Sequence, residues 1–201
     1  FGDSGNLGIF TLAPMGEKLY AGTFNLSGFQ VWATDAEGEP PYHWELVVDG
    51  GAGRGPLNQA VAAMRAFKGA LYVGTGIQGG GYDRVNDVGP APAEIVRINA
   101  DHSWDVIVGD PRETGHGFKS PLSVLRAGFA NFFAGYLWAF EEHDGWLYAG
   151  TYDWSVMLHW TRLEASLPKV RTLLERLGPD HIVENQGGFD LWRSADGENW
   201  V

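Results

Sequence analysis

The sequence of 201 residues contains no cysteine, which excludes disulfide bonds and thiolate metal sites and is compatible with either the cytoplasm or an extracellular space. Basic residues are scarce, because 14 Lys and Arg stand against 25 Asp and Glu and give a formal net charge of −11. Nucleic-acid backbones bind clustered positive charge, so the composition argues against nucleic acid as a partner. No apolar run approaches the roughly 20 residues that a membrane-spanning helix needs, so no membrane span is predicted.

What the sequence does contain is a repeated motif, Leu-Tyr-x-Gly-Thr, beginning at Leu19, Leu71 and Leu147. Short segments rich in β-branched and aromatic residues surround each copy, bounded by Gly, Pro, Asp or Asn, which is the pattern of short strands. Repetition at this spacing indicates a repeat architecture. The sequence therefore predicts one all-β domain over residues 1–201, built of three separate four-stranded antiparallel sheets. These repeats cover about residues 8–48, 59–108 and 135–201.

The connections between the expected strands differ in length in a regular way. The turns at residues 16–18, 68–69 and 143–145 stay short in every repeat. The loops after the second strand, at residues 25–28, 76–92 and 152–188, grow along the chain, as do the loops between repeats at 49–58 and 109–134. In an antiparallel meander these longer loops all emerge at one end, here called the elaborated end, opposite the short-turn end. Function concentrates on loops that a rigid scaffold holds.

The longest of these loops contains a predicted helix near residues 163–178. Apolar residues recur there at three- and four-residue steps: Leu163, Leu167, Val170, Leu174 and Leu177. Ser166 can cap this helix, Pro168 suits its first turn and Gly178-Pro179 ends it. We expect its apolar stripe to pack on the protein itself, with a partner-binding helix as the alternative.

The third repeat ends Ser194-Ala195-Asp196-Gly197-Glu198-Asn199-Trp200, which resembles the Asp-box of BNR-like β-propeller repeat proteins, bacterial and mostly uncharacterised, with sialidases as distant relatives. Weaker versions precede Trp44 and Trp104. The resemblance implies a β-propeller with about three blades present. Closed propellers have about four to eight blades, so the chain is expected to be part of a longer propeller and to aggregate alone. Ser194, Asp196, Gly197 and Trp200 are expected to build a turn rather than a site.

The candidate ligand site lies at the elaborated end and comprises Arg54, Asn58, Glu141, Glu142, Tyr152, Asp153 and Trp154. Tyr, Asp and Trp side by side suit stacking on a neutral sugar and hydrogen bonding to it. The alternative for Trp154 is that it covers the base of its loop. Glu141 and Glu142 are expected at the channel mouth, where they offer acid and base chemistry. The alternative is an ion pair between Glu141 and Arg65, which the repeats align.

These residues favour a binding module for a carbohydrate or another small polar ligand, with two alternatives left open. One is an Asp-box hydrolase whose catalytic residues lie partly on further blades, and the other is a protein-interaction scaffold, so the sequence does not decide whether the protein is an enzyme. Resemblance to a sialidase would require three convergent arginines, for which Arg54, Arg84 and Arg112 are the candidates, but the acidic balance argues against this.

No cofactor is expected, and neither is a metal bound through histidine, because the six histidines lack the spacing of a helical zinc pair. Calcium at Asp83, Asn86 and Asp87 stays an open alternative, although these residues match no EF-hand.

Overall fold

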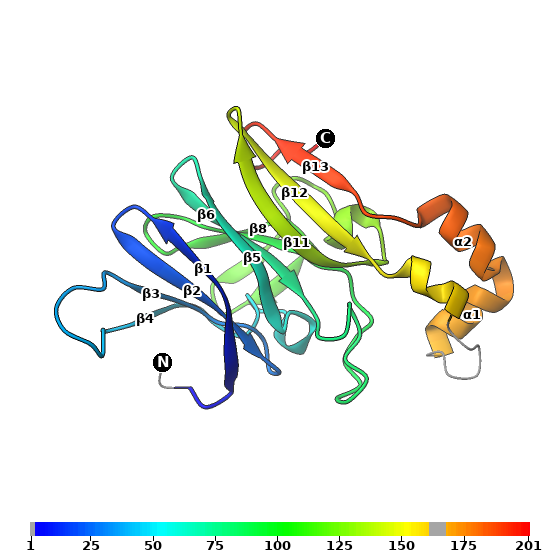
Figure 1. Ribbon diagram of the computed structural model, residues 1–201, viewed down its shortest axis with the longest axis horizontal. Helices are drawn as coiled ribbons and strands as arrows, with labels where there is room; N and C mark the ends of the chain where they lie inside the picture. The colour runs from blue at the N-terminus through cyan, green and yellow to red at the C-terminus, as the bar shows by residue number, and fades with distance from the viewer. Residues whose placement is uncertain (1–2, 161–167) are drawn as a thin grey trace.

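The computed structural model describes residues 3–160 and 168–201 (Figure 1). The described part is mostly strand with few helices, and every strand pairing in it is antiparallel, as the sequence predicts. The first repeat contains β1 (Asn6–Met15), β2 (Lys18–Asn25), β3 (Val31–Thr34) and β4 (Glu45–Val48). The second contains β5 (Ala60–Phe67), β6 (Ala70–Gly76), β7 (Ile95–Ile98) and β8 (Trp104–Val108). The third contains β11 (Ala134–His143), β12 (Trp146–Asp153) and β13 (Leu191–Ser194), with a bridge from Ser194 to Trp200.

The three repeats are linked into one sheet, so the prediction of three separate sheets is wrong. Each link is one residue pair, Phe24 with Ala60 and Gly76 with Tyr136. The physical reason is the shortness of the third strands. Because β3 pairs with β2 only as far as Gly22, the edge of β2 is open at Phe24 and β5 occupies it. The sheet does not close on itself.

The hydrophobic cores lie between neighbouring repeats. One core combines residues of the first two repeats, such as Val31 and Val73, and the other combines residues of the last two, such as Ile95 and Leu147. The middle repeat is therefore covered on both faces, and every residue of β6 is buried. By contrast, buried and partly exposed residues alternate along β12, because one face of the third repeat lacks a neighbour among the described residues.

The glycine of the repeated motif permits this close packing. A Cβ added to Gly22 would lie 2.5 Å from Val61 Cγ1, and one added to Gly74 would lie 2.5 Å from Leu137 Cβ. Val61 and Leu137 belong to the first strand of the following repeat in each case. The motif glycine thus lies where one repeat contacts the first strand of the next repeat.

The segment from Ser194 to Trp200 forms a hydrogen-bonded turn, as expected for Ser194, Asp196, Gly197 and Trp200. The Asp196 carboxylate accepts hydrogen bonds from the backbone amides of Glu198 and Asn199, both at 2.8 Å, and from the Ser194 hydroxyl at 3.0 Å. Gly197 has a positive φ of 84°, which favours glycine. Hydrogen bonds from the Asn199 backbone and side chain hold the pKa of Asp196 well below its usual range. Trp200 is buried in the core beside Phe129.

We expect Asp196→Ala to lower the free energy of unfolding by about 1 kcal/mol, or Tm by about 2–4 °C, because these amides lose their acceptor. The folded-state pKa lies below the unfolded value of about 3.9. The decrease in the free energy of unfolding should therefore have its full size above about pH 5 and become smaller as the pH falls below about 4. Thermal melts across pH 2.5–7 would test this, with exposed Glu184→Ala as the control. Equal effects of the two variants, or no pH dependence, would contradict it.

Several elements at the elaborated end were not predicted. The segment between β8 and β11 contains the hairpin β9 (Arg112–Thr114) and β10 (Gly117–Lys119) and the 3-10 helix η2 (Ala127–Ala130). Short 3-10 helices, η1 (Gly55–Leu57) and η3 (Ser155–Trp160), lie in two other loops.

The predicted helix is present as α1 (Pro168–Leu177), and residues 163–167 of that prediction lie outside the described part. A second helix, α2 (Pro179–Gln186), follows directly. Leu174 packs with Leu158 and Ile182, so this part of the stripe faces the protein, whereas Leu177 is exposed. Within the described residues, no helix combines the length and the apolar character needed to cross a bilayer.

Candidate functional site

The threonine that ends each motif copy anchors a polar residue at the elaborated end. Thr23, Thr75 and Thr151 donate their backbone N–H to the carbonyls of Gln30, Glu94 and Asp190, each at 3.0 Å. Their hydroxyls accept the N–H of the same three residues at 2.8–2.9 Å. Gln30, Glu94 and Asp190 therefore occupy equivalent positions in the three repeats, and their surroundings can be compared directly.

In the first repeat the Gln30 side chain is buried and fully hydrogen bonded. Its Nε2 donates to Asp3 at 2.8 Å and to Asp49 at 3.0 Å. Its Oε1 accepts from Asn6 at 2.7 Å and from Trp32 Nε1 at 3.0 Å. This position consequently ties loops together and offers nothing to a ligand.

In the second repeat the Glu94 carboxylate is completely buried and sits between two arginines. Arg112 Nη1 donates to it at 2.8 Å, Arg54 Nε lies 3.5 Å away, and Asn58 Nδ2 donates at 2.9 Å. Arg54 also donates to the Pro92 carbonyl at 2.7 Å. Arg54 and Asn58, both predicted as ligand residues, are therefore enclosed in a charge cluster that joins residues 49–58 to the second repeat.

The third repeat differs, because the Asp190 carboxylate has no hydrogen-bond or ion-pair partner among the described residues. Asp190 is partly exposed and lines a pocket of about 300 Å³. The other lining residues come from η2 and from the end of α2: Phe129, Ala130, Asn131, Asn185, Gln186 and Gly187. This polar pocket is the one place at the elaborated end where the anchored residue of a repeat faces open space.

The pocket is joined to the predicted residue Asp153 through Asn131. Asn131 Nδ2 donates to the Asp153 carboxylate at 2.8 Å, and the Ser155 backbone amide donates to it at 2.7 Å. The Ser155 hydroxyl is a further partner. Asp153 is buried and its oxygens are occupied, so it supports the wall of the pocket from behind.

The two aromatic residues beside Asp153 point to different places. The Trp154 ring packs on Phe133, with centroids 4.7 Å apart, and closes a small core with Leu158. This matches the alternative that Trp154 covers the base of its loop. Tyr152 instead lies against Tyr136 and Trp138 on the open face of the third sheet. Neither residue lines the polar pocket.

The backbone that forms the floor of the pocket is held in an unusual conformation. Gly128, Phe129 and Ala130 all have positive φ, at 64°, 56° and 68°. Such a conformation is costly for a bulky residue such as Phe129 and persists only where the surroundings stabilise it. The stabilisation comes from the Phe129 ring, which stacks on Trp192 with centroids 4.4 Å apart. Strained backbone of this kind clusters at ligand sites.

Glu141 and Glu142 lie at the short-turn end, not at the elaborated end where the sequence analysis placed them. Strand β11 begins at the elaborated end with Ala134, paired with Asp153, and reaches the short turn at its last residues. Both glutamates are exposed. Glu141 pairs with Arg65, which confirms the alternative of an ion pair. These carboxylates are therefore remote from the other predicted site residues.

The loop that was considered for calcium is closed by its own hydrogen bonds. The buried Asp83 carboxylate accepts from Gln59 Nε2 at 3.0 Å and from Asn86 Nδ2 at 2.7 Å, and Asp87 accepts from the Tyr82 hydroxyl at 2.7 Å. Among residues 3–160 and 168–201, no three His, Asp or Glu side chains are grouped so that they could hold a metal ion.

Sequence reasoning missed Asn131, Asn185, Gln186 and Asp190, although one signal was present. Asp190 precedes its strand as Glu94 and Gln30 precede theirs, and aligning the third strands would have identified it. Comparison of the chain with protein-family models, with curated proteins and with solved structures finds no match.

Proposed function

We propose that the protein is a ligand-binding module that takes a carbohydrate or another small polar ligand in the pocket lined by Asp190. The observation that carries this proposal is the comparison of the three equivalent residues. Gln30 and Glu94 are saturated by the protein's own donors, whereas the Asp190 carboxylate faces a polar pocket without a partner among the described residues. A ligand rich in hydroxyl or amine groups would donate hydrogen bonds to the Asp190 carboxylate, as arginine and asparagine do to Glu94.

The scaffold for this site is a β-propeller, with each repeat as one blade. Two features support this part of the proposal. The repeats pack face to face through one repeated interface, and the turn before Trp200 has the hydrogen bonds of an Asp-box. Loops at one end of a propeller commonly surround a ligand site, and the polar pocket lies at the end where the loops of this chain are longest.

The chemistry of the pocket supports binding in preference to hydrolysis. Glycosidases usually use two carboxylates on opposite sides of the scissile bond. Asp190 is the only carboxylate among the residues that line the pocket, and the nearby Asp153 is occupied by Asn131 and Ser155. Two of the three arginines that a sialidase would need are also committed elsewhere, because Arg54 and Arg112 both contact Glu94.

We expect Asp190→Asn to weaken binding of a neutral sugar by at least about tenfold, because a charged acceptor is lost. Saturation-transfer NMR with a panel of glucose, galactose, mannose and N-acetylglucosamine would identify the sugar, and titration would compare the variants. Asp144→Asn is the matched control, because it makes the same change in an exposed residue at the short-turn end. Absence of binding across the panel would refute the carbohydrate class, and loss of binding only in the control would show that the wrong end was assigned.

A further inference from the structure

Both interfaces between repeats follow one rule at the motif glycine. Gly22 receives Val61, and Gly74 receives Leu137. Both aliphatic residues are completely buried. Strand register makes Ile9 the equivalent residue of the first repeat, because Ile9 pairs with Thr23 as Val61 pairs with Thr75 and Leu137 pairs with Thr151.

Within the described residues, the first and the third repeat each carry one half of this contact without its other half. Ile9 is 50% exposed, in contrast to its two buried equivalents. At Gly150 in the third repeat, an added Cβ would meet nothing closer than Ala139 Cβ at 4.0 Å. In the third repeat the surface over Gly150 is therefore uncovered, and in the first repeat Ile9 is an exposed aliphatic residue of the type that covers this glycine in the other repeats.

A second contact at the same interfaces repeats this complementarity. Each link between repeats joins an aromatic residue to a small one, Phe24 with Ala60 and Tyr136 with Gly76. The equivalent residues at the two open edges are Tyr152 in the third repeat and Gly8 in the first. Tyr152 and Gly8 are again one aromatic and one small residue. A Cβ added at Gly8 would meet nothing within 4 Å.

A third contact involves the motif tyrosine and the turn before the tryptophan. The Tyr20 hydroxyl lies 3.2 Å from His102 Nε2, and the Tyr72 hydroxyl lies against Gly197. His102 and Gly197 each follow an aspartate and have positive φ. The unmatched equivalents are Tyr148, which is partly exposed, and Ala36, which follows Asp35 and has a φ of 55°.

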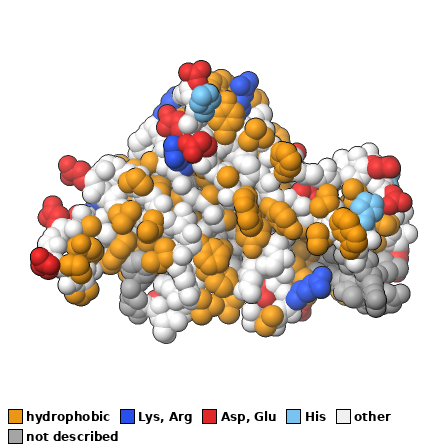
Figure 2. All heavy atoms as spheres, viewed as in Figure 1, with side chains coloured by type: hydrophobic (Ala, Val, Ile, Leu, Met, Phe, Trp, Pro, Cys, Tyr) orange, Lys and Arg blue, Asp and Glu red, His pale blue; other side chains and the backbone are white. Residues whose placement is uncertain are grey.

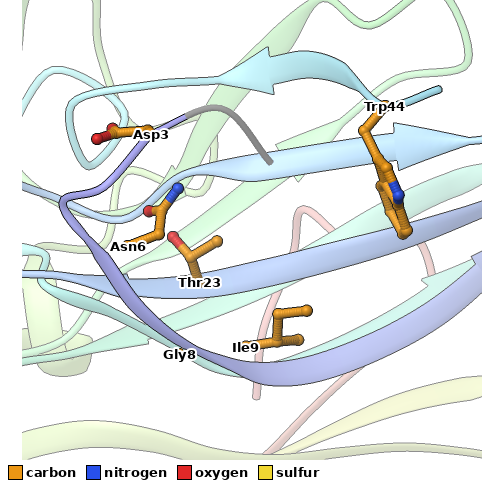
Figure 3. Close-up of a pocket in the computed structure, with 6 residues that line it drawn as sticks. All are labelled: Asp3, Asn6, Gly8, Ile9, Thr23 and Trp44. Carbon is orange, nitrogen blue, oxygen red and sulfur yellow. The ribbon is translucent and has the colours of Figure 1, made fainter. Parts of the chain in front are cut away.

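The open edge of the first repeat is also hollowed. A pocket of about 400 Å³ is lined by Asp3, Asn6, Gly8, Ile9, Thr23 and Trp44, and Figure 3 shows Ile9 reaching into it from β1 and Trp44 from the loop before β4. Gly8 and Ile9, the two residues expected to contact a preceding repeat, are thus part of a concave surface.

The first strands of the repeats add an apolar surface between the two edges. Strands β1, β5 and β11 lie side by side, and hydrophobic side chains form a band across this face (Figures 1 and 2). Phe10 and Trp138 are more than half exposed and line a further pocket of about 330 Å³ with Ala62 and Tyr136. Contiguous exposed apolar surface is typical of interaction sites.

We propose that two copies of this chain associate edge to edge through a two-fold axis, so that Ile9 of each copy packs on Gly150 of the other. The three contacts described above would then form twice, and six repeats would make a closed ring with the apolar band of β1, β5 and β11 facing its centre. A second copy fits because both complementary halves belong to the same chain, as a two-fold closed assembly requires. The interface continues the one that already joins the repeats. The proposal does not depend on the ligand proposed above.

Sedimentation velocity of the 201-residue chain tests this arrangement, and we expect a dimer. Ile9→Asp and Gly150→Val should each weaken the dimer by at least about tenfold, because one places a charge in the contact and the other fills the glycine surface. The controls make the same substitutions at exposed sites away from both edges, Val85→Asp and Gly115→Val, and should leave the dimer intact. A wild-type monomer, an open-ended polymer, or a dimer that both edge variants leave unchanged would overturn the proposal.

A mixing experiment separates loss of the interface from loss of the fold. Gly150→Val on one chain and Ile9→Gly on another exchange the large and small partners of one junction and leave the second junction native. Each variant alone should be mainly monomeric with a cooperative melt, and an equimolar mixture should form heterodimers. Failure of the mixture to associate, with both variants folded, would also overturn the proposal.

Discussion

Replacing Glu94 by glutamine is expected to lower the free energy of unfolding by about 3–5 kcal/mol, the loss typical of a buried ion pair deprived of one partner. Glutamine preserves the volume of the side chain but removes the carboxylate charge that pairs with Arg112 and Arg54, which leaves Arg54 with Asp110 at 3.5 Å. The side chains of these arginines are only 9% and 12% exposed, so water cannot replace the carboxylate freely. The cluster also joins the first repeat to the second, and its failure should loosen residues 49–58.

Urea denaturation at one fixed protein concentration would measure this loss. Glu113→Gln is the control, because Glu113 is an exposed glutamate on β9 beside Arg112. The control should change the free energy of unfolding by less than about 0.5 kcal/mol. A loss of similar size in both variants would show that Glu94 is not held as a buried charge.

The second large effect is expected for Gly74→Val, which should cost about 3 kcal/mol, the upper end of the usual overpacking range. The new Cβ would lie 2.5 Å from Leu137 Cβ and 3.0 Å from the Leu137 carbonyl oxygen. Because a backbone atom blocks the site, the neighbouring strand must move and the core between the second and third repeats must open. Thermal melting with Gly115→Val as the control measures the effect.

Gly115 provides a fair comparison, since an added Cβ there would meet nothing within 4 Å and its φ is not positive. The control should therefore lose only the small amount expected for an exposed turn. If Gly74→Val melts within about 2 °C of the wild type, a loss of no more than about 1 kcal/mol, the close approach of the two strands is not needed for stability.

The strands could be predicted because their signal is local and is repeated three times. The predicted repeats at about residues 8–48 and 59–108 correspond to strands β1–β4 at residues 6–48 and β5–β8 at residues 60–108. The links between the repeats could not be predicted in this way. They depend on β3 being shorter than β2 and β7 being shorter than β6, and the end of a strand is set by which neighbouring strand pairs with that edge.

The missed helix α2 and hairpin β9–β10 have different causes. Gly178-Pro179 ends α1 as expected, but proline at the first position also begins a helix, so the same two residues serve both purposes. The hairpin strands Arg112–Thr114 and Gly117–Lys119 are short and mostly polar, so they show no alternation that would distinguish them from a loop.

For the candidate site, residue type was a weaker guide than position in the repeat. Arg54 and Asn58 have ligand-binding chemistry, but a buried carboxylate from the next repeat occupies them, and that contact is invisible in sequence. The misplacement of Glu141 and Glu142 was avoidable, because both directly precede a tight turn and so belong to the short-turn end. Whether Asp190 faces a free pocket depends on how α2 and η2 fold around it.

The location of the cores between repeats has a consequence for how such a chain can change during evolution. Each repeat has one face with the motif glycine and another face with the aliphatic residue that packs on such a glycine. Duplication of the DNA that encodes a repeat therefore adds a unit whose two interfaces already match those of its neighbours. The new unit requires no redesign of the interior. Divergence can then act on the loops of one end alone, as the lengthening from residues 25–28 to residues 152–188 illustrates, while the motif glycines keep neighbouring copies compatible.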